Sequence, residues 1–433
     1  MKKIIIFLLA AVAMLASVSC VPEDVANETS PHEATAPETT SEPTAPELVL
    51  VDGGKTDFKV VRAEGAKGFA FDTAAAFNKR LRDKISPDFI ITDDWVSPRK
   101  PSPEKDHEIL LFETNRAESL AAIADLDFHG YIIRVTDCKI VIVGTSPAAC
   151  SEALYHFVDT LIPEHTKNGK ISFPIGLEVK QEFKASDLDI AKALRQGKAL
   201  CADFEVIFNY PIKDGFNAAQ GVATDGSSAY VVMMDSSGER EVGRIVMVDM
   251  ATWTVVKESE TMTLDHSNDM TYDPATKQLI VTNMYDNLVS IIDAETLTLV
   301  EQKKLPYGTY GAGYIDGSEK YAFLGYGSVG GLVITDKAFN VLRSTPLDSV
   351  TNYVGQGMDA DAKYAYVPLS PKSGIDHNII QIYDITSGEF FGNAIVKTTM
   401  ESESMFHVGD DIYMHFNNQG SKIAKLEFYI RFE

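Results

Sequence analysis

An aspartate recurs along the second half of the chain at nearly constant spacing. It follows a short β-rich run at intervals of 48, 43, 45 and 49 residues, at Asp225, Asp273, Asp316, Asp361 and Asp410. A second column of acids closes a later β-rich run at intervals of 44, 43, 48 and 43 residues, at Asp249, Asp293, Asp336, Asp384 and Glu427. Two columns with matched spacing predict that residues 203–433 contain five copies of one structural unit.

Each unit consists of β-rich runs without helical periodicity. The first contains SAYVVMM and GRIVMVDM, and the second contains QLIVTNM and LVSIIDA. Four-stranded repeats of this length are typical of propeller blades, so we expect an all-β five-bladed β-propeller over residues 203–433. The fifth unit ends after its third strand, so the run 204–210 (FEVIFNY) is expected to supply the missing outer strand and close the ring. The column aspartates are expected to cap turns.

Residues 48–182 show a different pattern, in which short β-rich runs alternate with helical periodicity. Apolar residues recur at helical spacing in 68–85 and again after Pro147, and runs such as 108–112 and 139–143 are β-rich. This alternation predicts a small α/β sandwich domain. The chain is therefore expected to be multidomain, with residues 183–202 as the linker to the propeller.

The N-terminus has the pattern of an export signal. Lys2 and Lys3 precede an apolar run that ends in small residues before Cys20. This run is shorter than the roughly 20 residues that a spanning helix needs. The segment resembles the lipobox of bacterial lipoproteins, which implies cleavage after residue 19 and a lipid on Cys20. The alternative is an ordinary signal peptide with a cysteine there by chance.

A strongly acidic stretch follows the cysteine. Residues 21–47 contain seven acids, five prolines and five threonines, and no Lys or Arg. Such a segment cannot bury enough apolar surface to fold, and its like charges extend it. We therefore interpret residues 20–47 as a lipid anchor and disordered tether. The expected location is the extracytoplasmic face of the cell membrane, reached through the lipid at Cys20.

Charge and cysteine content exclude some classes of function. The chain carries 39 basic and 62 acidic residues, a formal net charge of −23. Such a surface repels phosphate backbones, so no nucleic-acid partner is expected. Beyond Cys20, only Cys138, Cys150 and Cys201 remain, an odd set that suggests buried free thiols more than a disulfide framework.

Residues 108–116, 130–133 and 139–144 carry a resemblance in the first region. They include Glu108-Ile109-Leu110, Thr114-Asn115-Arg116 and Gly130-Tyr131-Ile132-Ile133. The order of pieces resembles the N-terminal accessory domain of β-N-acetylhexosaminidases and α-glucuronidases, which implies a carbohydrate-associated ancestry. In that family the catalytic acids lie on a following TIM barrel. Residues 183–433 do not alternate strand with helix, which argues against hexosaminidase activity.

The second region carries a resemblance of architecture. The segment 266–274 (HSNDMTYDP) is similar to one in bacterial surface propellers, and the region resembles propellers of the lactonase and quinoprotein-like type. In a propeller the innermost strand of each blade lines the central channel. Five residues before each first-column aspartate stand Gln220, Asn268, Gly311, Gln356 and Met405.

Three amides at five equivalent positions can donate to and accept from sugar hydroxyls or water. We expect ligand-binding residues at the channel mouth, namely Gln220, His266, Asn268, Asp269, Tyr310, Gln356 and His407. The alternative is that these amides bond one another and channel water, fixing the register of the blades. In the first region, Arg116 and Asp137 are interpreted as a surface arginine and a turn aspartate rather than as ligand groups.

These patterns favour a non-catalytic surface protein that binds carbohydrate or a surface protein partner through the propeller. The alternative is an extracellular carbohydrate-active hydrolase or lyase, for which Asp269, Asp359 and Glu403 could supply the paired carboxyls. A third possibility is a protein-interaction platform without a small ligand. GxSxG, HExxH, CxxC and a Gly-rich phosphate loop are all absent from the sequence. No catalytic residue, cofactor or metal site is therefore predicted.

Overall fold

The computed structural model describes residues 46–97, 103–235 and 242–433. The signal segment, Cys20 and nearly all of the expected tether lie outside the described residues. Within the described part of the chain, no helix is long and apolar enough to cross a membrane.

The first region is built on a six-stranded sheet with the order β3-β2-β4-β6-β5-β9. Strands β3, β2, β4 and β6 are parallel, and β5 and β9 are antiparallel to their neighbours. The strands are β2 (Lys59–Arg62), β3 (Ile90–Asp93), β4 (Glu108–Leu111), β5 (Gly130–Val135), β6 (Lys139–Gly144) and β9 (Glu178–Glu182). A separate sheet holds β1 (Glu47–Asp52), β7 (Thr166–Lys167) and β8 (Lys170–Pro174).

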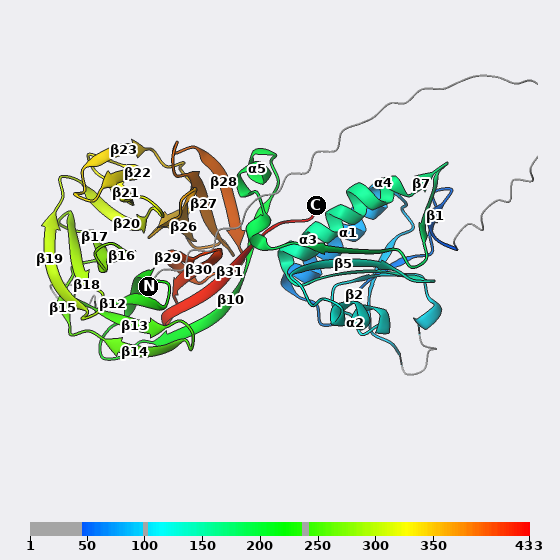
Figure 1. Cartoon of the computed structure of the whole chain (residues 1–433), viewed down its shortest axis with the longest axis horizontal. Helices are drawn as coiled ribbons and strands as arrows, with labels where there is room; N and C mark the ends of the chain where they lie inside the picture. The colour runs from blue at the N-terminus through cyan, green and yellow to red at the C-terminus, as the bar shows by residue number, and fades with distance from the viewer. Residues whose placement is uncertain (1–45, 98–102, 236–241) are drawn as a thin grey trace, which may run out of the picture. The chain divides into compact units, whose positions relative to one another are not determined.

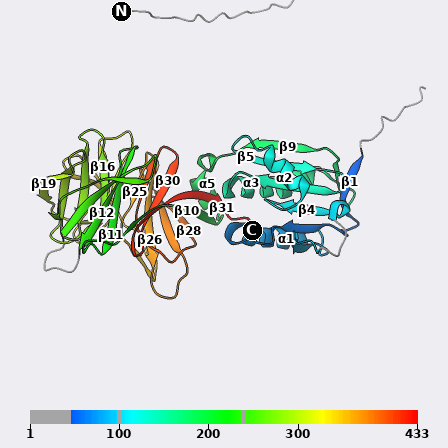
Figure 2. The same cartoon turned by 90° about the horizontal axis from the view of Figure 1, so that it is seen from below.

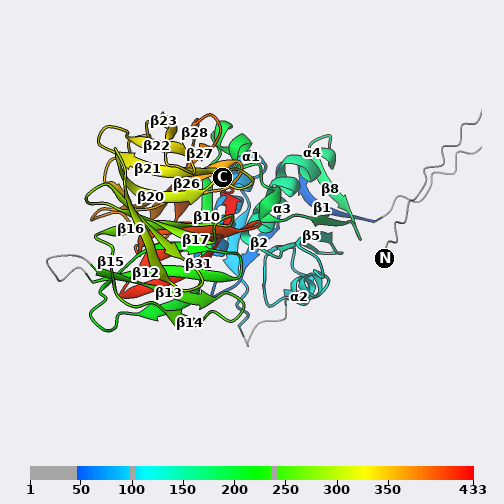
Figure 3. The same cartoon turned by 60° about the vertical axis from the view of Figure 1, so that its left-hand side comes forward.

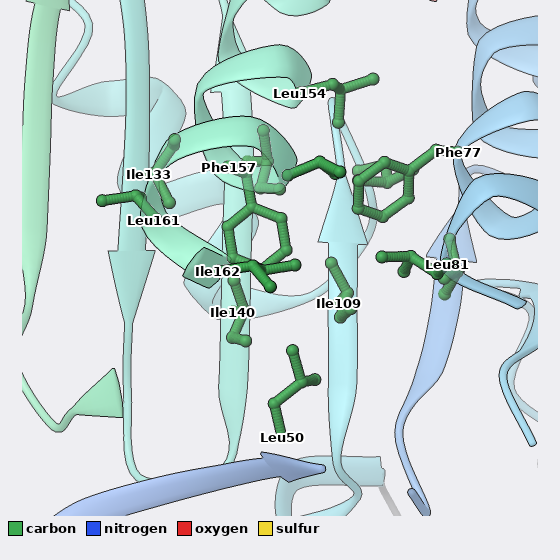
Figure 4. Close-up of a cluster of buried hydrophobic side chains, with 14 of the residues drawn as sticks. Leu50, Phe77, Leu81, Ile109, Ile133, Ile140, Leu154, Phe157, Leu161 and Ile162 are labelled. Atoms are coloured by element: carbon green, nitrogen blue, oxygen red, sulfur yellow. The ribbon is translucent and has the colours of Figure 1, made fainter. Parts of the chain in front are cut away.

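Helices cover both faces of the six-stranded sheet. The main helices are α1 (Gly68–Lys84), α2 (Ala117–Ala124) and α3 (Pro147–His156), which continues through a π-helical turn (Phe157–Leu161) into α4 (Ile162–Glu164). Phe77 of α1 and Phe157 pack with Ile109 and Ile140 on one face, as Figure 4 shows. On the other face, Ala122 of α2 packs in a second buried cluster.

The second region consists of antiparallel sheets. The first holds β11 (Ala218–Thr224), β12 (Ser228–Asp235), β13 (Val242–Asp249), β14 (Thr254–Glu258) and β15 (Met262–Thr263). The second holds β16 (Ser267–Asp273), β17 (Gln278–Asn283), β18 (Leu288–Asp293) and β19 (Thr298–Lys304). The third, which Figure 3 shows as one sheet, holds β20 (Gly308–Tyr314), β21 (Lys320–Tyr326), β22 (Gly331–Asp336) and β23 (Val341–Thr345).

A nine-stranded sheet completes the second region and contains two antiparallel runs. One run holds β24 (Tyr353–Gly355), β25 (Asp359–Ala360), β26 (Tyr364–Pro371), β27 (Asn378–Asp384) and β28 (Phe390–Val396). The other holds β29 (Glu401–Val408), β30 (Asp411–Asn417), β31 (Gly420–Ile430) and β10 (Leu200–Pro211). The start of β10 pairs in parallel with β28 and joins the two runs.

The first strands of these runs form a closed ring. Strand β11 contacts β16 on one side and β29 on the other, β16 contacts β20, and β25 contacts both β20 and β29. Figure 1 shows the sheets following one another around this ring. The prediction of a mostly β, propeller-like fold is therefore confirmed.

The expected closing strand 204–210 lies within β10. This strand pairs antiparallel with β31 from Leu200 to Pro211, and Figure 2 shows β10, β28 and β31 as neighbours. The stretch 183–202, expected as a linker, carries the 3-10 turn Ala185–Asp187, helix α5 (Ile190–Arg195) and the first residues of β10. It is folded because Ile190, Ala193 and Leu200 are buried in one cluster with the last two β runs.

Several column acids cap turns. Asp225 Oδ1 accepts from the backbone N–H groups of Ser227 and Ser228. The same arrangement occurs at Asp273, Asp361, Asp249, Asp293, Asp336 and Asp384. Two members of the columns do something else, since Asp316 pairs with His407 and Glu427 accepts from the N–H of Ala148 at 3.2 Å.

The chain after β31 contacts the first region directly. Phe432 is 1% exposed and belongs to the buried cluster of α1 and α3, with its ring 4.7 Å from that of Tyr155 and 5.8 Å from that of Phe77. The hydroxyl of Ser151 donates to the carbonyl of Ile430. The last strand of the second region therefore leads into the core of the first.

Candidate binding site at the inner strands

Each inner strand carries a β-bulge at the same level. In β16, Ser267 pairs with Asn283 and Asp269 pairs with Thr282, which leaves Asn268 as the extra residue. In β20 the same shift leaves Tyr310 as the extra residue, and in β29 it leaves Glu403.

The other two inner strands follow the same rule. In β11 the pairs Ala219–Met233 and Val222–Val231 place Gln220 and Gly221 opposite one partner residue. Between β24 and β25 the three residues 356–358 lie opposite two residues of β26. A bulge bends the strand and changes the direction of a side chain, and bulges are common beside functional sites.

We take one residue from each bulge and call the set the bulge ring, which consists of Gln220, Asn268, Tyr310, Gln356 and Glu403. Sequence spacing had placed Gly311 and Met405 at the third and fifth positions, and the bulges show that this assignment is wrong. Met405 is instead 1% exposed and packed in a hydrophobic cluster. The spacing failed because the chain between the bulge and the column aspartate varies in length.

The bulge ring is tightly packed. A Cβ added to Gly221 would lie 2.5 Å from the Cα of Asp269, and one added to Gly357 would lie 2.4 Å from the carbonyl oxygen of Glu403. Only glycine allows such a close approach of neighbouring strands. Asn268 Nδ2 donates to the carbonyl of Gln356 at 3.4 Å, a contact between residues of different inner strands.

Asp269 lies directly beside the bulge ring and is fully buried. Its Oδ2 accepts from the backbone N–H groups of Ala312 at 2.9 Å and Met358 at 2.8 Å, and its Oδ1 accepts from Ser404 Oγ at 2.5 Å. One carboxyl thus joins four of the five inner strand segments. Burial raises the pKa of Asp269 well above its usual range, although these three donors act in the opposite direction.

Three members of the bulge ring have buried oxygens without a hydrogen-bond partner among the described residues, namely Gln220 Oε1, Asn268 Oδ1 and Glu403 Oε2. Their residues are 6%, 2% and 1% exposed. Buried polar atoms in native structures nearly always have a partner, so three such atoms at one level of the ring indicate a ligand or water. The sequence gives the residue types but not this lack of partners.

Acidic groups adjoin these oxygens. Glu401 Oε1 accepts from Gln356 Nε2 at 3.4 Å, and Glu401 Oε2 accepts from Asn417 Nδ2 at 3.3 Å. Burial raises the pKa of Glu403 well above its usual range, and the carboxylates of Glu401 and Asp269 raise it further. Sequence reasoning missed Glu401 and Asn417, because they lie outside the spacing that was followed.

Two predicted site residues lie away from the bulge ring. His266 precedes β16, is partly buried, and has its ring 5.4 Å from that of Tyr285. His407 lies near the other end of its inner strand, between Asp359 Oδ2 at 2.7 Å from Nδ1 and Asp316 Oδ2 at 2.9 Å from Nε2. Asp359 is the main cause that raises the pKa of His407 to about 11.

His407 lines a separate cavity of about 240 Å³. This cavity lies at the ends of the inner strands that carry Asp225, Tyr272 and Tyr314. The predicted set is therefore divided, since Gln220, Asn268, Tyr310 and Gln356 belong to the bulge ring and His407 does not.

The interpretation of Arg116 as a surface residue is wrong. Arg116 is 8% exposed and makes a two-pronged ion pair with Glu108, with both N–O distances 3.0 Å. Lys139, which is fully buried, lies 3.1 Å from the same carboxylate. Sequence reasoning missed this network because its members are separated along the chain. Asp137 is exposed in the turn between β5 and β6.

Three cysteines lie in the described part of the chain. Cys138, Cys150 and Cys201 form no disulfide, and burial raises the pKa of Cys150 to about 12. Among the described residues, no group of three or more His, Cys, Asp and Glu side chains is placed to hold a metal ion.

No family model and no curated protein matches the chain. Among solved structures, Myxococcus xanthus glutaminyl cyclase aligns over 54% of this chain and 99% of its own, with 10% identity and a TM-score of 0.40. A tail fibre of a Staphylococcus aureus phage covers 53% of each chain, with 11% identity and a TM-score of 0.40. The Swd1 β-propeller domain of Myceliophteria thermophila aligns over 49% of this chain and 67% of its own, with 12% identity and a TM-score of 0.29. Scores this low carry no argument about function.

Proposed function

We propose that this chain is an exported surface lipoprotein, anchored through Cys20, that binds carbohydrate without chemical turnover. In this proposal residues 48–182 are a small α/β sandwich domain, residues 203–433 are a five-bladed β-propeller, and the ligand binds at the bulge ring. The observation that carries the proposal is the set of three buried oxygens without partners, on Gln220, Asn268 and Glu403.

The chemistry of the ring supports a hydroxyl-rich ligand. The three partnerless oxygens are acceptors, and sugar hydroxyls donate. Tyr310 adds an aromatic side chain at the same level, partly buried and with its ring 6.4 Å from that of Tyr326. Aromatic faces and amides together are suited to sugar rings, whose faces are apolar and whose edges are polar.

A glycan array probed with the full chain, purified in detergent, tests this proposal. Gln356→Ala is the informative variant, because Gln356 is only partly buried and its loss should spare the fold. Loss of one ligand hydrogen bond predicts roughly 10-fold weaker binding. Gln181→Ala is the matched control, since Gln181 is exposed in the first region and its side chain donates to the adjacent Glu182 carbonyl.

If Gln356→Ala and Gln181→Ala bind the array equally well, the ligand binds outside the bulge ring. A chain that binds no glycan but captures a surface protein would support the interaction platform and overturn the carbohydrate proposal. Lipidation is tested separately by mass spectrometry of the mature N-terminal peptide. An unmodified Cys20 would overturn that part of the proposal.

A carbohydrate-active hydrolase or lyase is the second candidate, favoured by the raised pKa of Glu403, because a carboxyl that stays protonated can act as a general acid. The two candidates differ in product formation. Release of new sugar ends from a polysaccharide by the wild-type chain, abolished in Glu403→Gln, would establish catalysis and overturn the non-catalytic proposal.

A further inference from the structure

We infer that the bulge ring recognises its ligand through a cation, held by Gln220 Oε1, Asn268 Oδ1 and Glu403 Oε2. This inference rests on the proposed function, because it takes the bulge ring to be the carbohydrate site, and it adds which group of the ligand the site selects. The cation is either an ammonium group on the glycan itself or a metal ion that bridges the ring and sugar hydroxyls.

The three oxygens come from three successive inner strands. Strand β11 contacts both β16 and β29, so Gln220 stands between Asn268 and Glu403 around the ring. Asn268 and Glu403 are the extra residues of their strands, and Gln220 shares one partner residue with Gly221 at the β11 bulge. The three acceptors therefore lie at matching bulges of three neighbouring strands.

A hydrogen bond to Gln356 sets the orientation of the Asn268 amide. Asn268 Nδ2 donates to the Gln356 carbonyl, so Oδ1 is the atom left without a partner. The reverse orientation would set two oxygens against each other. Asn268 therefore offers the site an acceptor, as the carboxylate of Glu403 does.

Three acids lie at or beside the bulge ring, and two of them, Asp269 and Glu403, are buried. Burial raises the pKa of Glu403 well above its usual range, and the nearby carboxyl groups of Glu401 and Asp269 raise it further. None of the ion pairs formed by the described residues includes any of these three acids. A buried carboxylate without a cation is costly, and a cationic ligand would remove that cost.

An ammonium group and a metal ion can each bind the three partnerless oxygens. A primary ammonium group has three N–H donors, one for each partnerless oxygen. A calcium ion takes carboxylate and amide oxygens as ligands and fills the remaining positions with water or sugar hydroxyls. Neither kind needs the His or Cys ligands that are absent from the ring.

Isothermal titration of the full chain in detergent tests the inference. One arm titrates calcium chloride, and the other titrates glucosamine with neutral glucose as its control. We expect saturable binding in one arm, with release of a proton from Glu403 that is visible as a dependence of the heat on the ionisation enthalpy of the buffer. Binding in the calcium arm identifies a metal ion, and binding of glucosamine but not glucose identifies an ammonium group.

Two variants and one control make the result specific. Glu403→Gln keeps the shape of the side chain and removes its charge, so the affinity for the cation should fall about 10- to 100-fold. Gln220→Glu adds a carboxylate, so the affinity should rise by about 10-fold, a gain that misfolding cannot produce. Glu301→Gln, on the exposed outer strand β19, should leave the affinity unchanged.

Equal cation affinity in wild type, Glu403→Gln and Gln220→Glu would overturn the inference, and so would the absence of saturable binding in both arms. The proposed function is judged by a different result. One result would keep the carbohydrate proposal and overturn the cation inference. In that result neutral glycans bind, Gln356→Ala weakens their binding, and neither calcium nor glucosamine binds saturably in the titration. If cations bind and no glycan does, the carbohydrate proposal is wrong.

Discussion

The carboxyl of Asp269 provides the sharpest test of how the ring is held together. Replacing Asp269 with Ala removes the acceptor of the backbone N–H groups of Ala312 and Met358. It also removes the acceptor of the Ser404 hydroxyl, but that hydroxyl already lies 3.4 Å from the carbonyl of Met405 and can turn toward it. Two buried backbone donors are therefore left without a partner.

The expected size of the effect follows from these two donors. A buried donor that loses its partner costs about 1–3 kcal/mol, so Asp269→Ala should lower the free energy of unfolding by about 2–6 kcal/mol. Asp269→Asn should cost less than about 1.5 kcal/mol. Its amide oxygen can still accept from both backbone N–H groups, and its NH₂ can donate to Ser404 Oγ. Because burial already favours the uncharged form of Asp269, the loss of the charge should matter little.

Guanidinium denaturation followed by tryptophan fluorescence measures both variants. The chain has two tryptophans, and Trp95 is 57% exposed, so Trp95→Phe leaves Trp253 as the single reporter. Trp253 packs beside Phe208 and Tyr413 and so reports on the propeller-like region. If Asp269→Asn is as destabilising as Asp269→Ala, the charge and not the hydrogen-bond geometry holds the ring, and the reasoning fails.

Three further predictions concern other contacts. Phe432→Ala should lower the free energy of unfolding of the first region by about 3–5 kcal/mol, because it empties a buried aromatic site, and hydrogen exchange of α1 and α3 should rise. If hydrogen exchange in α1 and α3 is unchanged, the claim that Phe432 stabilises the first region is wrong. Glu108→Ala should cost about 3–5 kcal/mol in chemical denaturation, since it leaves the buried cations of Arg116 and Lys139 unpaired, and a loss under about 1 kcal/mol would contradict this account. Burial raises the pKa of Glu403 in the folded state above its value in the unfolded state. The contribution of Glu403 to stability is therefore fully present below the unfolded-state pKa and is lost as pH rises through the folded-state pKa. Between about pH 5 and pH 8 the melting temperature of the wild type should therefore fall more than that of Glu403→Gln. If the two melting temperatures change equally with pH, this prediction is wrong.

The architecture of the second region was predictable because it repeats. Most of the recurring acids stand at turns, and the capping bonds at Asp225 and Asp249 show why an acid recurs there. A carboxylate that accepts from nearby backbone N–H groups satisfies the turn locally, so the sequence signal and its physical cause lie within a few residues. The propeller-like fold follows from such local signals.

The bulge ring was only partly predictable. Spacing found Gln220, Asn268 and Gln356, and Tyr310 was predicted as a neighbouring site residue. Glu403 was considered only as a carboxyl of the alternative hydrolase, because counting placed Met405 at its position. A bulge shifts the register by one residue, and it is visible only when a strand is paired with its neighbour. Counting along one strand cannot detect it.

The long-range ion pairs could not be predicted from the sequence for a related reason. Glu108, Arg116 and Lys139 are ordinary surface residue types, and their burial depends on three segments meeting in the first region. His407 illustrates the same point in the second region. Asp359 belongs to β25 and Asp316 to the turn after β20, so no local pattern could show that His407 is held between two carboxylates.

The bulges also bear on how such a chain can change over time. Side chains along a strand alternate between two faces, so most substitutions in an inner strand disturb packing on one face or the other. An extra residue stands outside that alternation, and the pattern on either side continues undisturbed. The bulge ring holds five such positions, so its residues can change among related proteins while the alternation of each inner strand is kept. The same property makes the five codons of the bulge ring a compact target for a mutant library.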